Sequence, residues 1–270
     1  MSEHAANFSW PRKTSILGTG LSLAGKDEVI ALLSLWLKSG NKRAIIVTAN
    51  AEILLWASEH SSYQQILNKA PLVTIDGFGV FCALFWHKIL RKIEPSIAQL
   101  WQLRFTGRQL LENICLLAPA RKWRIFLLGG QSLQAAKKTA QILQEKHGNG
   151  QKLLIQSWPG PLEVAKETTG EWRETKMKIN AFKPDFIFIA FGYPKPEEWL
   201  AKHAKDLDFG VALGVGGVFN EIAGFRKAAP SWVNRLGLES YWRLLTEPKR
   251  FKRIFRALIK FPLAVVFGPS

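Results

Sequence analysis

The chain of 270 residues repeats one pattern along most of its length: a short apolar run is followed by a longer segment with helical periodicity. About seven of these runs have the length and composition of buried strands, and the segments between them space their apolar residues as on one face of a helix. The runs are residues 15–17, 43–47, 72–75, 123–128, 153–156, 185–190 and 210–213. Apolar strands that alternate with helices predict an α/β fold, with a largely parallel Rossmann-like sheet and helices on both faces.

The stretch LVTIDGFGV at residues 72–80 has the clearest transition from strand to helix. Its apolar and β-branched residues end at Asp76-Gly77, and an apolar helical pattern begins at Val80. We therefore expect Asp76 at the carboxyl end of a strand, which is the edge of an open α/β sheet where ligands bind. Two interpretations of Asp76 remain open at this point: it makes the turn or caps the helix, or it takes part in chemistry.

Polar and glycine residues follow several of the other predicted strands. Thr48 and Asn50 stand where a strand turns into a helix N-terminus, so they either cap that helix or hold a phosphate or a sugar hydroxyl. Glycines and one tyrosine follow three further strands: Gly129, Gly130, Gly192, Tyr193, Gly214 and Gly216. Several glycine turns and helix N-termini that face one crevice favour a nucleotide diphosphate as the ligand.

Common nucleotide and metal motifs do not fit this chain. Phe219 stands where a dinucleotide fingerprint would need its third glycine, and no P-loop sequence is present. Asp206 and Asp208 have the Asp-x-Asp spacing of some metal sites, but they precede a predicted strand, so we interpret them as a turn at the opposite edge of the sheet. The five histidines have no ligand spacing. The sequence therefore predicts neither a metal nor a cofactor.

The composition indicates an anionic partner. The chain has 37 Lys and Arg against 21 Asp and Glu, a formal net charge of +16, which favours nucleic acid, lipid headgroups or phosphorylated substrates. Cys82 and Cys115 both lie in apolar helical patterns, as is typical of free thiols in a reducing compartment. The N-terminus does not have the pattern of a secretory signal, and no run reaches the roughly 20 apolar residues of a membrane span. We therefore expect a cytoplasmic protein that contacts membranes only peripherally.

The composition changes at residue 225, which divides the chain into an α/β domain (12–224) and a basic helical C-terminal appendage (225–270). The apolar positions of its last helix are Phe251, Ile254, Phe255, Leu258 and Ile259, and basic residues take the other face. This amphipathic pattern is typical of a helix at a membrane interface, where each basic residue near an anionic leaflet contributes about 1 kcal/mol. A helix packed on its own domain and a nucleic-acid contact are the alternatives.

Seven motifs follow one another along the chain: VTANAEI, TIDGFGV, RFTGRQL, FLLGG, PDFIFIAFGYPKPEEW, GVALGVGGVFNEIAG and GLESYWRLLTEPKRFKRI. In these motifs and their order the chain resembles the WecG/TagA/CpsF glycosyltransferases, from about residue 12 to residue 261. The resemblance implies an inverting hexosyltransferase that moves a sugar from a UDP-sugar to a second sugar carried on a polyprenyl diphosphate. It also implies work at the inner face of the plasma membrane, in exopolysaccharide or cell-envelope glycan synthesis, without a metal.

The resemblance implies roles for individual residues. Asp76 matches the general base that removes a proton from the acceptor hydroxyl, and Thr48 and Asn50 match residues of the same pocket. Arg104, Arg243, Arg250 and Arg253 match basic positions of the family, and we group them with the glycine turns and Tyr193 as donor- or diphosphate-binding residues. Positive charge suits the UDP leaving group, and the planar guanidinium suits a diphosphate.

The chain departs from the family pattern at three positions. Gln109 and Asn220 replace aspartates, and Pro196 replaces a glutamine. With these departures a different donor sugar or a reduced activity remains open. The alternatives are a non-catalytic protein that binds a nucleotide sugar or a lipid diphosphate, and a basic nucleic-acid-binding protein. The leading prediction has a UDP-sugar, a lipid-linked saccharide and an anionic membrane surface as partners, no nucleic acid, and allows a homo-oligomer.

Overall fold

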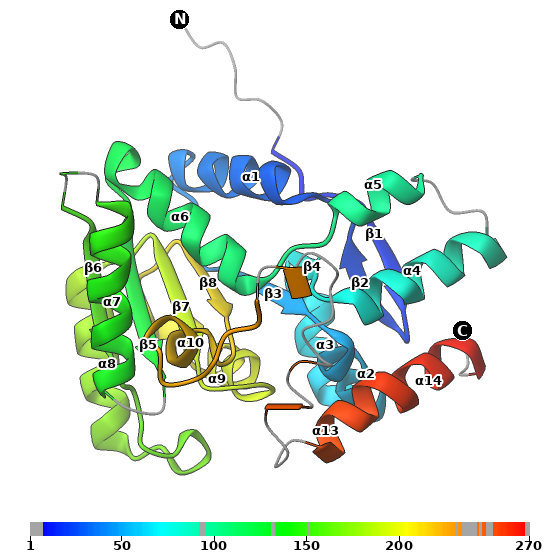
Figure 1. Cartoon of the computed structure of the whole chain (residues 1–270). Helices are drawn as coiled ribbons and strands as arrows, with labels where there is room; N and C mark the ends of the chain where they lie inside the picture. Colours follow the sequence, from blue (N-terminus) through cyan, green and yellow to red (C-terminus); the bar gives the residue numbers. More distant parts are fainter. Residues whose placement is uncertain are drawn as a thin grey trace, which may run out of the picture.

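A parallel sheet of six strands forms the centre of the computed structural model, which describes residues 8–91, 96–130, 133–148, 150, 152–230, 232–233, 242, 245–246 and 251–267 (Figure 1). Its strands are β3 (Ala44–Ala49), β4 (Leu72–Ile75), β5 (Arg124–Gly129), β6 (Leu154–Trp158), β7 (Phe186–Ala190) and β8 (Val211–Gly214). They lie in the order β4-β3-β8-β7-β5-β6, and every neighbouring pair is parallel. The predicted α/β fold class is confirmed.

Helices cover both faces of this sheet (Figure 1). On one face lie α1 (Lys26–Lys38), α6 (Gly107–Arg121), α7 (Leu133–His147) and α10 (Val218–Ile222). On the other lie α8 (Thr169–Phe182) and α9 (Lys195–His203), while α2 (Ala51–Glu59), α3 (Ser61–Lys69) and α4 (Phe78–Arg91) build a further core on β3 and β4. Successive strand residues alternate between the cores, so Ile125 and Phe126 are both buried but point in opposite directions. This explains why the strands read as continuous apolar runs.

Two predictions for the first half of the chain were wrong or incomplete. The first predicted strand is not part of the main sheet: β1 (Lys13–Ile16) and β2 (Thr19–Ser22) form a separate antiparallel hairpin. Only Leu17 and Gly18 separate these two strands, and so short a turn joins antiparallel neighbours, not a parallel crossover. In addition, α5 (Ile97–Gln102) lies within residues 91–107, which the sequence predicts to be a connection between two helices. A reciprocal cap between Ser96 and Gln99 starts this helix.

The C-terminal helices lie against α2 and α4 (Figure 1). They comprise α13 (Phe251–Phe255), a π-helical segment (Arg256–Lys260) and α14 (Phe261–Phe267). Ile254, Ala257 and Phe261 are buried, Phe261 lies in the core that α2, α3 and α4 share, and Arg256 pairs with Glu59 of α2. Self-packing is thus confirmed for one side of this helix. No helix among the described residues is long and apolar enough to cross a bilayer.

Candidate functional site

The carboxyl ends of β3 and β4 bring two predicted site residues to one edge of the sheet. Ala49 pairs with Ile75 in the register of these strands, and the Asp76 amide donates to the Ala49 carbonyl at 2.9 Å. Asn50 and Asp76 therefore follow directly on neighbouring strand ends. Asp76 is half-buried, so part of this residue is open at the edge of the sheet.

Thr48 and Asn50 both take part in the local structure of this edge. Thr48 is buried on β3, and its hydroxyl donates to the Gly214 carbonyl of β8 at 3.3 Å. Asn50 caps α2, because its side-chain oxygen accepts from the Ile53 amide at 3.0 Å. Capping by Asn50 is therefore confirmed, whereas Thr48 joins the ends of two strands. A direct role in chemistry for either residue stays a prediction.

Arg104 reaches the end of β4 from a different part of the chain. Its segment pairs with Ile75 through an isolated parallel bridge, and the Phe105 amide donates to the Ile75 carbonyl at 3.1 Å. The central carbon of the guanidinium lies 4.2 Å from the centre of the Trp101 ring, which is a cation–π contact. Asp76 and Arg104 thus adjoin the same residue, one next to it in the chain and the other beside it in space.

A cavity of about 970 Å³ opens at Arg104, between the starts of α1 and α6 and the helix α5. Its polar lining residues are Arg12, Lys26, Asp27, Glu28, Ser96, Gln99, Gln102, Arg104 and Gln109. Three of these side chains are cations and two are carboxylates, so the lining has a positive bias. A space beside Arg104 with this charge suits part of an anionic ligand.

Two of the positions that depart from the family pattern have structural roles. Gln109 forms a capping box with Thr106 at the start of α6: the Gln109 amide donates to the Thr106 hydroxyl at 3.1 Å, and the Gln109 side-chain oxygen accepts from the Thr106 amide at 2.9 Å. Pro196 is buried in the first turn of α9, where its missing amide proton leaves no helical bond unmade. The side chains of both residues therefore serve the helix starts on which they lie.

The predicted glycine turns differ in what surrounds them. A Cβ atom on Gly129 would lie 2.8 Å from the Phe191 ring, and one on Gly214 would lie 2.9 Å from the Glu197 carboxylate. A Cβ atom on Gly130 would also meet side-chain atoms, at 3.2 Å. These three glycines admit close packing inside the protein.

Gly192 and Gly216 instead border open space. Both have positive φ values, 76° and 58°, and, apart from their neighbours in the chain, no atom of the described residues lies within 4 Å of the place where a Cβ would stand. Such a backbone can approach a phosphate closely. Tyr193, next to Gly192, packs in part on the core formed by α2, α3 and α4. Of the predicted glycines, these two therefore leave the most room for a ligand.

Glu197 is a buried carboxyl near the site that the sequence analysis did not single out. It lies in the first turn of α9, directly against Gly214, and accepts a hydrogen bond from the Tyr63 hydroxyl at 3.1 Å. Burial raises the pKa of Glu197 to about 7, and the negative charge of Glu198 adds to this increase. Desolvation and the nearby Glu197 carboxylate also raise the pKa of Tyr63. The pair of Glu197 and Tyr63 therefore packs behind Gly214, the last residue of β8.

Arg226 is a cation beside the same turn that was not predicted as a site residue. A Cβ atom on Gly217 would lie 2.6 Å from its guanidinium, so only glycine leaves room for the arginine there. Glu221 pairs with Arg226 and lies 3.7 Å from Arg108 of α6. The four consecutive residues Gly-Val-Gly-Gly at 214–217 are the sequence signal for this close approach, but they do not reveal which side chain makes it.

The predicted arginines of the appendage are not placed by the structure. Arg243 and Arg250 lie outside the described residues. Arg253 lies in α13, and its side chain is outside the described part of the chain. Their diphosphate contacts stay predictions.

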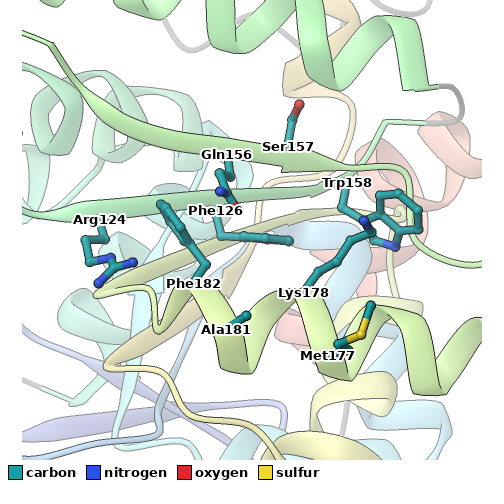
Figure 2. Close-up of a pocket in the computed structure, with 9 residues that line it drawn as sticks. All are labelled: Arg124, Phe126, Gln156, Ser157, Trp158, Met177, Lys178, Ala181 and Phe182. Atoms are coloured by element: carbon teal, nitrogen blue, oxygen red, sulfur yellow. The ribbon is translucent and has the colours of Figure 1, made fainter.

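A second pocket, of about 550 Å³, lies at the far end of the sheet between β5, β6 and α8 (Figure 2). Its two cations face aromatic rings: Lys178 lies 4.2 Å from the centre of the Trp158 ring, and Arg124 lies 4.7 Å from that of Phe182. None of the predicted site residues lines this pocket. The candidate site therefore lies at the ends of β3, β4 and β8.

Acidic residues away from this edge have structural partners. Asp208 pairs with Lys42, and its amide donates to the Asn180 side chain at 2.8 Å. Asp206 lies 3.7 Å from Lys176 and precedes β8, so the interpretation of this Asp-x-Asp as a turn at the opposite edge is confirmed. Within the described residues, no group of three or more His, Cys, Asp and Glu side chains has the arrangement of a metal site.

Comparisons with known proteins cover nearly the whole chain. Residues 14–268 match the family described as "Glycosyl transferase WecG/TagA/CpsF family". The chain is also similar to proteins of Staphylococcus aureus strains NCTC 8325, COL and MRSA252 that are named N-acetylglucosaminyldiphosphoundecaprenol N-acetyl-beta-D-mannosaminyltransferase. Each is 28% identical over 243 residues, which are 90% of this chain and 88% of the relative. The matched range contains Asp76, Arg104 and all the predicted glycine turns.

Proposed function

Because the chain belongs to the WecG/TagA/CpsF family of glycosyltransferases, we propose that it transfers a hexose or an N-acetylhexosamine from a UDP-sugar to a saccharide carried on a polyprenyl diphosphate. The anomeric configuration inverts in this reaction. The names of the S. aureus relatives specify N-acetylmannosaminyl transfer to N-acetylglucosaminyldiphosphoundecaprenol. A lipid-linked acceptor of this kind would place the enzyme in cell-envelope glycan or exopolysaccharide synthesis.

This proposal rests on one observation: Asp76 and Arg104 both adjoin Ile75, at the end of β4. In an inverting displacement the acceptor oxygen bonds to the anomeric carbon, the bond from that carbon to the UDP oxygen breaks, and UDP leaves. Asp76 takes the proton of the acceptor hydroxyl as general base. Arg104 supplies positive charge for the diphosphate of the lipid-linked acceptor, and the turns at Gly192 and Gly216 leave room for the diphosphate of UDP.

The test uses the purified full-length chain, a panel of labelled UDP-sugars and a short-chain lipid-diphosphate sugar. We expect transfer from at least one donor, and a loss of at least about 100-fold in kcat for Asp76→Asn with UDP binding retained. Asp206→Asn is the matched control, because it removes the same charge at the opposite edge of the sheet. Turnover of Asp76→Asn at the wild-type rate would exclude Asp76 as the base. UDP binding without transfer to any acceptor would favour the non-catalytic alternative.

Membrane attachment through the C-terminal helices is a further part of the proposal. Their outward side carries a row of exposed apolar side chains, here called the outer stripe: Phe251, Phe255, Ile259, Leu263, Val266 and Phe267. Phe251 is 54% exposed and Phe267 is 80% exposed. Apolar side chains lined up in this way on a basic amphipathic helix suit insertion at a lipid interface. The site would then face lipid-linked acceptors at the inner face of the plasma membrane.

Vesicles with anionic lipids test this attachment. The double variant Phe255→Ser and Ile259→Ser should lose most vesicle binding and keep UDP binding, because both side chains are exposed and lie outside the core. Met177→Ser is the control, since Met177 is 60% exposed on α8, which carries none of the outer stripe. Unchanged vesicle binding in the double variant would contradict the proposed role of the outer stripe. Salt-sensitive retention on DNA or RNA without vesicle binding would favour the nucleic-acid alternative.

A further inference from the structure

The outer side of α4 carries a row of aromatic rings that begins next to Asp76. Phe78, Phe81 and Phe85 stack along the helix, with 5.8 Å between the first two ring centres and 6.4 Å between the second two. Trp101 of α5 meets Phe81 edge to face, with 5.0 Å between ring centres. These four rings are called the aromatic row below.

The fully buried residues of α4 lie on its inner side. Val80, Ala83 and Leu84 are buried there among residues of α2 and α3. The three phenylalanines of the aromatic row are only partly buried, although Phe81 also packs in part on this core, and Trp101 is 39% exposed. A helix that is apolar on its inner side and also on a side open to solvent presents a surface for an apolar partner.

The surroundings of the aromatic row indicate which apolar partner fits. The Arg104 guanidinium lies on the Trp101 ring, so a cation stands beside the row. Asp76 precedes the first ring by two residues, and α14, which carries part of the outer stripe, contacts α4. Figure 1 shows α4, α5 and α14 together at one end of the molecule. A carboxylate, a cation and a row of rings near a lipid-directed surface match the hydroxyl, diphosphate and prenyl chain of one lipid-linked sugar.

We propose that the aromatic row binds the first isoprene units of the acceptor's prenyl chain, an inference that rests on the lipid-linked acceptor proposed above. From Phe78 to Phe85 the helix rises about 10 Å, so the row contacts only the part of the chain next to the diphosphate. Apolar contact along the row holds that part against α4 while Arg104 meets the diphosphate. The rest of the prenyl chain continues into the bilayer.

Calorimetry with farnesyl diphosphate and with inorganic diphosphate separates the aromatic row from the cation. We expect the full-length protein to bind farnesyl diphosphate at least about 10-fold more tightly than inorganic diphosphate. Phe81→Ser and Phe85→Ser should each weaken binding of farnesyl diphosphate about 5-fold, which corresponds to about 1 kcal/mol of apolar contact. Their affinity for inorganic diphosphate should not change. Phe85→Leu should restore most of the loss, and Met177→Ser should have no effect.

A photoreactive farnesyl diphosphate gives a second readout on the unmodified protein, which a folding defect of a variant cannot affect. We expect crosslinks within residues 78–86 or 97–102. Crosslinks only elsewhere, or equal affinity for the two diphosphates, would overturn the inference.

The inference and the proposed function fail in different ways. Tighter binding of farnesyl diphosphate without any sugar transfer would refute the enzymatic proposal and support prenyl binding by the aromatic row. Sugar transfer with the same KM for lipid-linked and short soluble acceptors would support the enzymatic proposal and refute prenyl binding by the aromatic row.

Discussion

Glu197, which packs against the last residue of β8, offers a direct test of how burial controls the ionisation of a carboxyl. Its carboxyl is buried, and loss of hydration raises its pKa to about 7 although the Tyr63 hydrogen bond favours the charged form. In the unfolded chain the carboxyl has its ordinary pKa of 4.5. Between these two values the folded protein binds more protons than the unfolded chain. The free energy of unfolding therefore falls as the pH rises from 4.5 towards 7.

Glu197→Gln removes this titration and keeps the shape of the side chain. Its amide oxygen still accepts from the Tyr63 hydroxyl, so the contact between α3 and α9 remains. The difference between the folded and unfolded pKa values of Glu197 corresponds to about 3 kcal/mol of unfolding free energy. The wild type loses this free energy once the pH exceeds both values. We therefore expect the variant to differ little from the wild type at about pH 5, and to be more stable by about 2 to 3 kcal/mol at about pH 8.

Urea unfolding followed by tryptophan fluorescence at the two pH values measures this difference. Glu198→Gln is the matched control, because Glu198 is the exposed neighbour of Glu197 and its replacement removes the same charge. The control should show no comparable pH-dependent gain. If Glu197→Gln gains the same stability at both pH values, or if Glu198→Gln gains as much, burial does not control the ionisation of Glu197.

Three other substitutions test local contacts. Thr106→Ala should lower the free energy of unfolding by about 1 kcal/mol, since the capping box of α6 is lost; urea unfolding measures it. Gly214→Ala should lower it by about 1 to 3 kcal/mol, because the new Cβ would lie 2.9 Å from Glu197 and 3.0 Å from Pro196; a wild-type melting temperature would contradict this. Phe261→Ala should cost about 3 to 5 kcal/mol and reduce vesicle binding, since the buried ring anchors the outer stripe; wild-type stability would refute that anchoring.

The main sheet could be predicted because each of its strands is buried on both faces. Ile125 and Phe126 lie in different cores, and this requires apolar residues at successive positions. The hairpin at residues 13–22 was harder to assign, since its short apolar run does not reveal its partner strand. The helix α5 depends on a cap between Ser96 and Gln99 more than on a long periodic pattern.

The candidate site could be predicted only where one residue follows a strand in the chain. Asp76 is such a residue, and its location at a strand end is confirmed, while its role as base stays a prediction. Arg104 was predicted only through the family resemblance. Its contact with Ile75 joins segments far apart in the sequence, and residue spacing does not reveal such a contact. Glu197 and Arg226 depend on close contacts with glycines that no spacing reveals.

The last helix shows why one amphipathic pattern allowed two interpretations. Spacing groups Ile254 with Phe255, yet Ile254 is 2% exposed and Phe255 is 45% exposed. On the buried side, Phe261 lies in the core of α2, α3 and α4, and α2 also contacts the π-helical segment that contains Ala257. Packing on the domain and the proposed contact with lipid therefore involve different sides of the same helix. Because the buried side holds the helix in place, the outer stripe can meet a membrane without release of the helix from the domain.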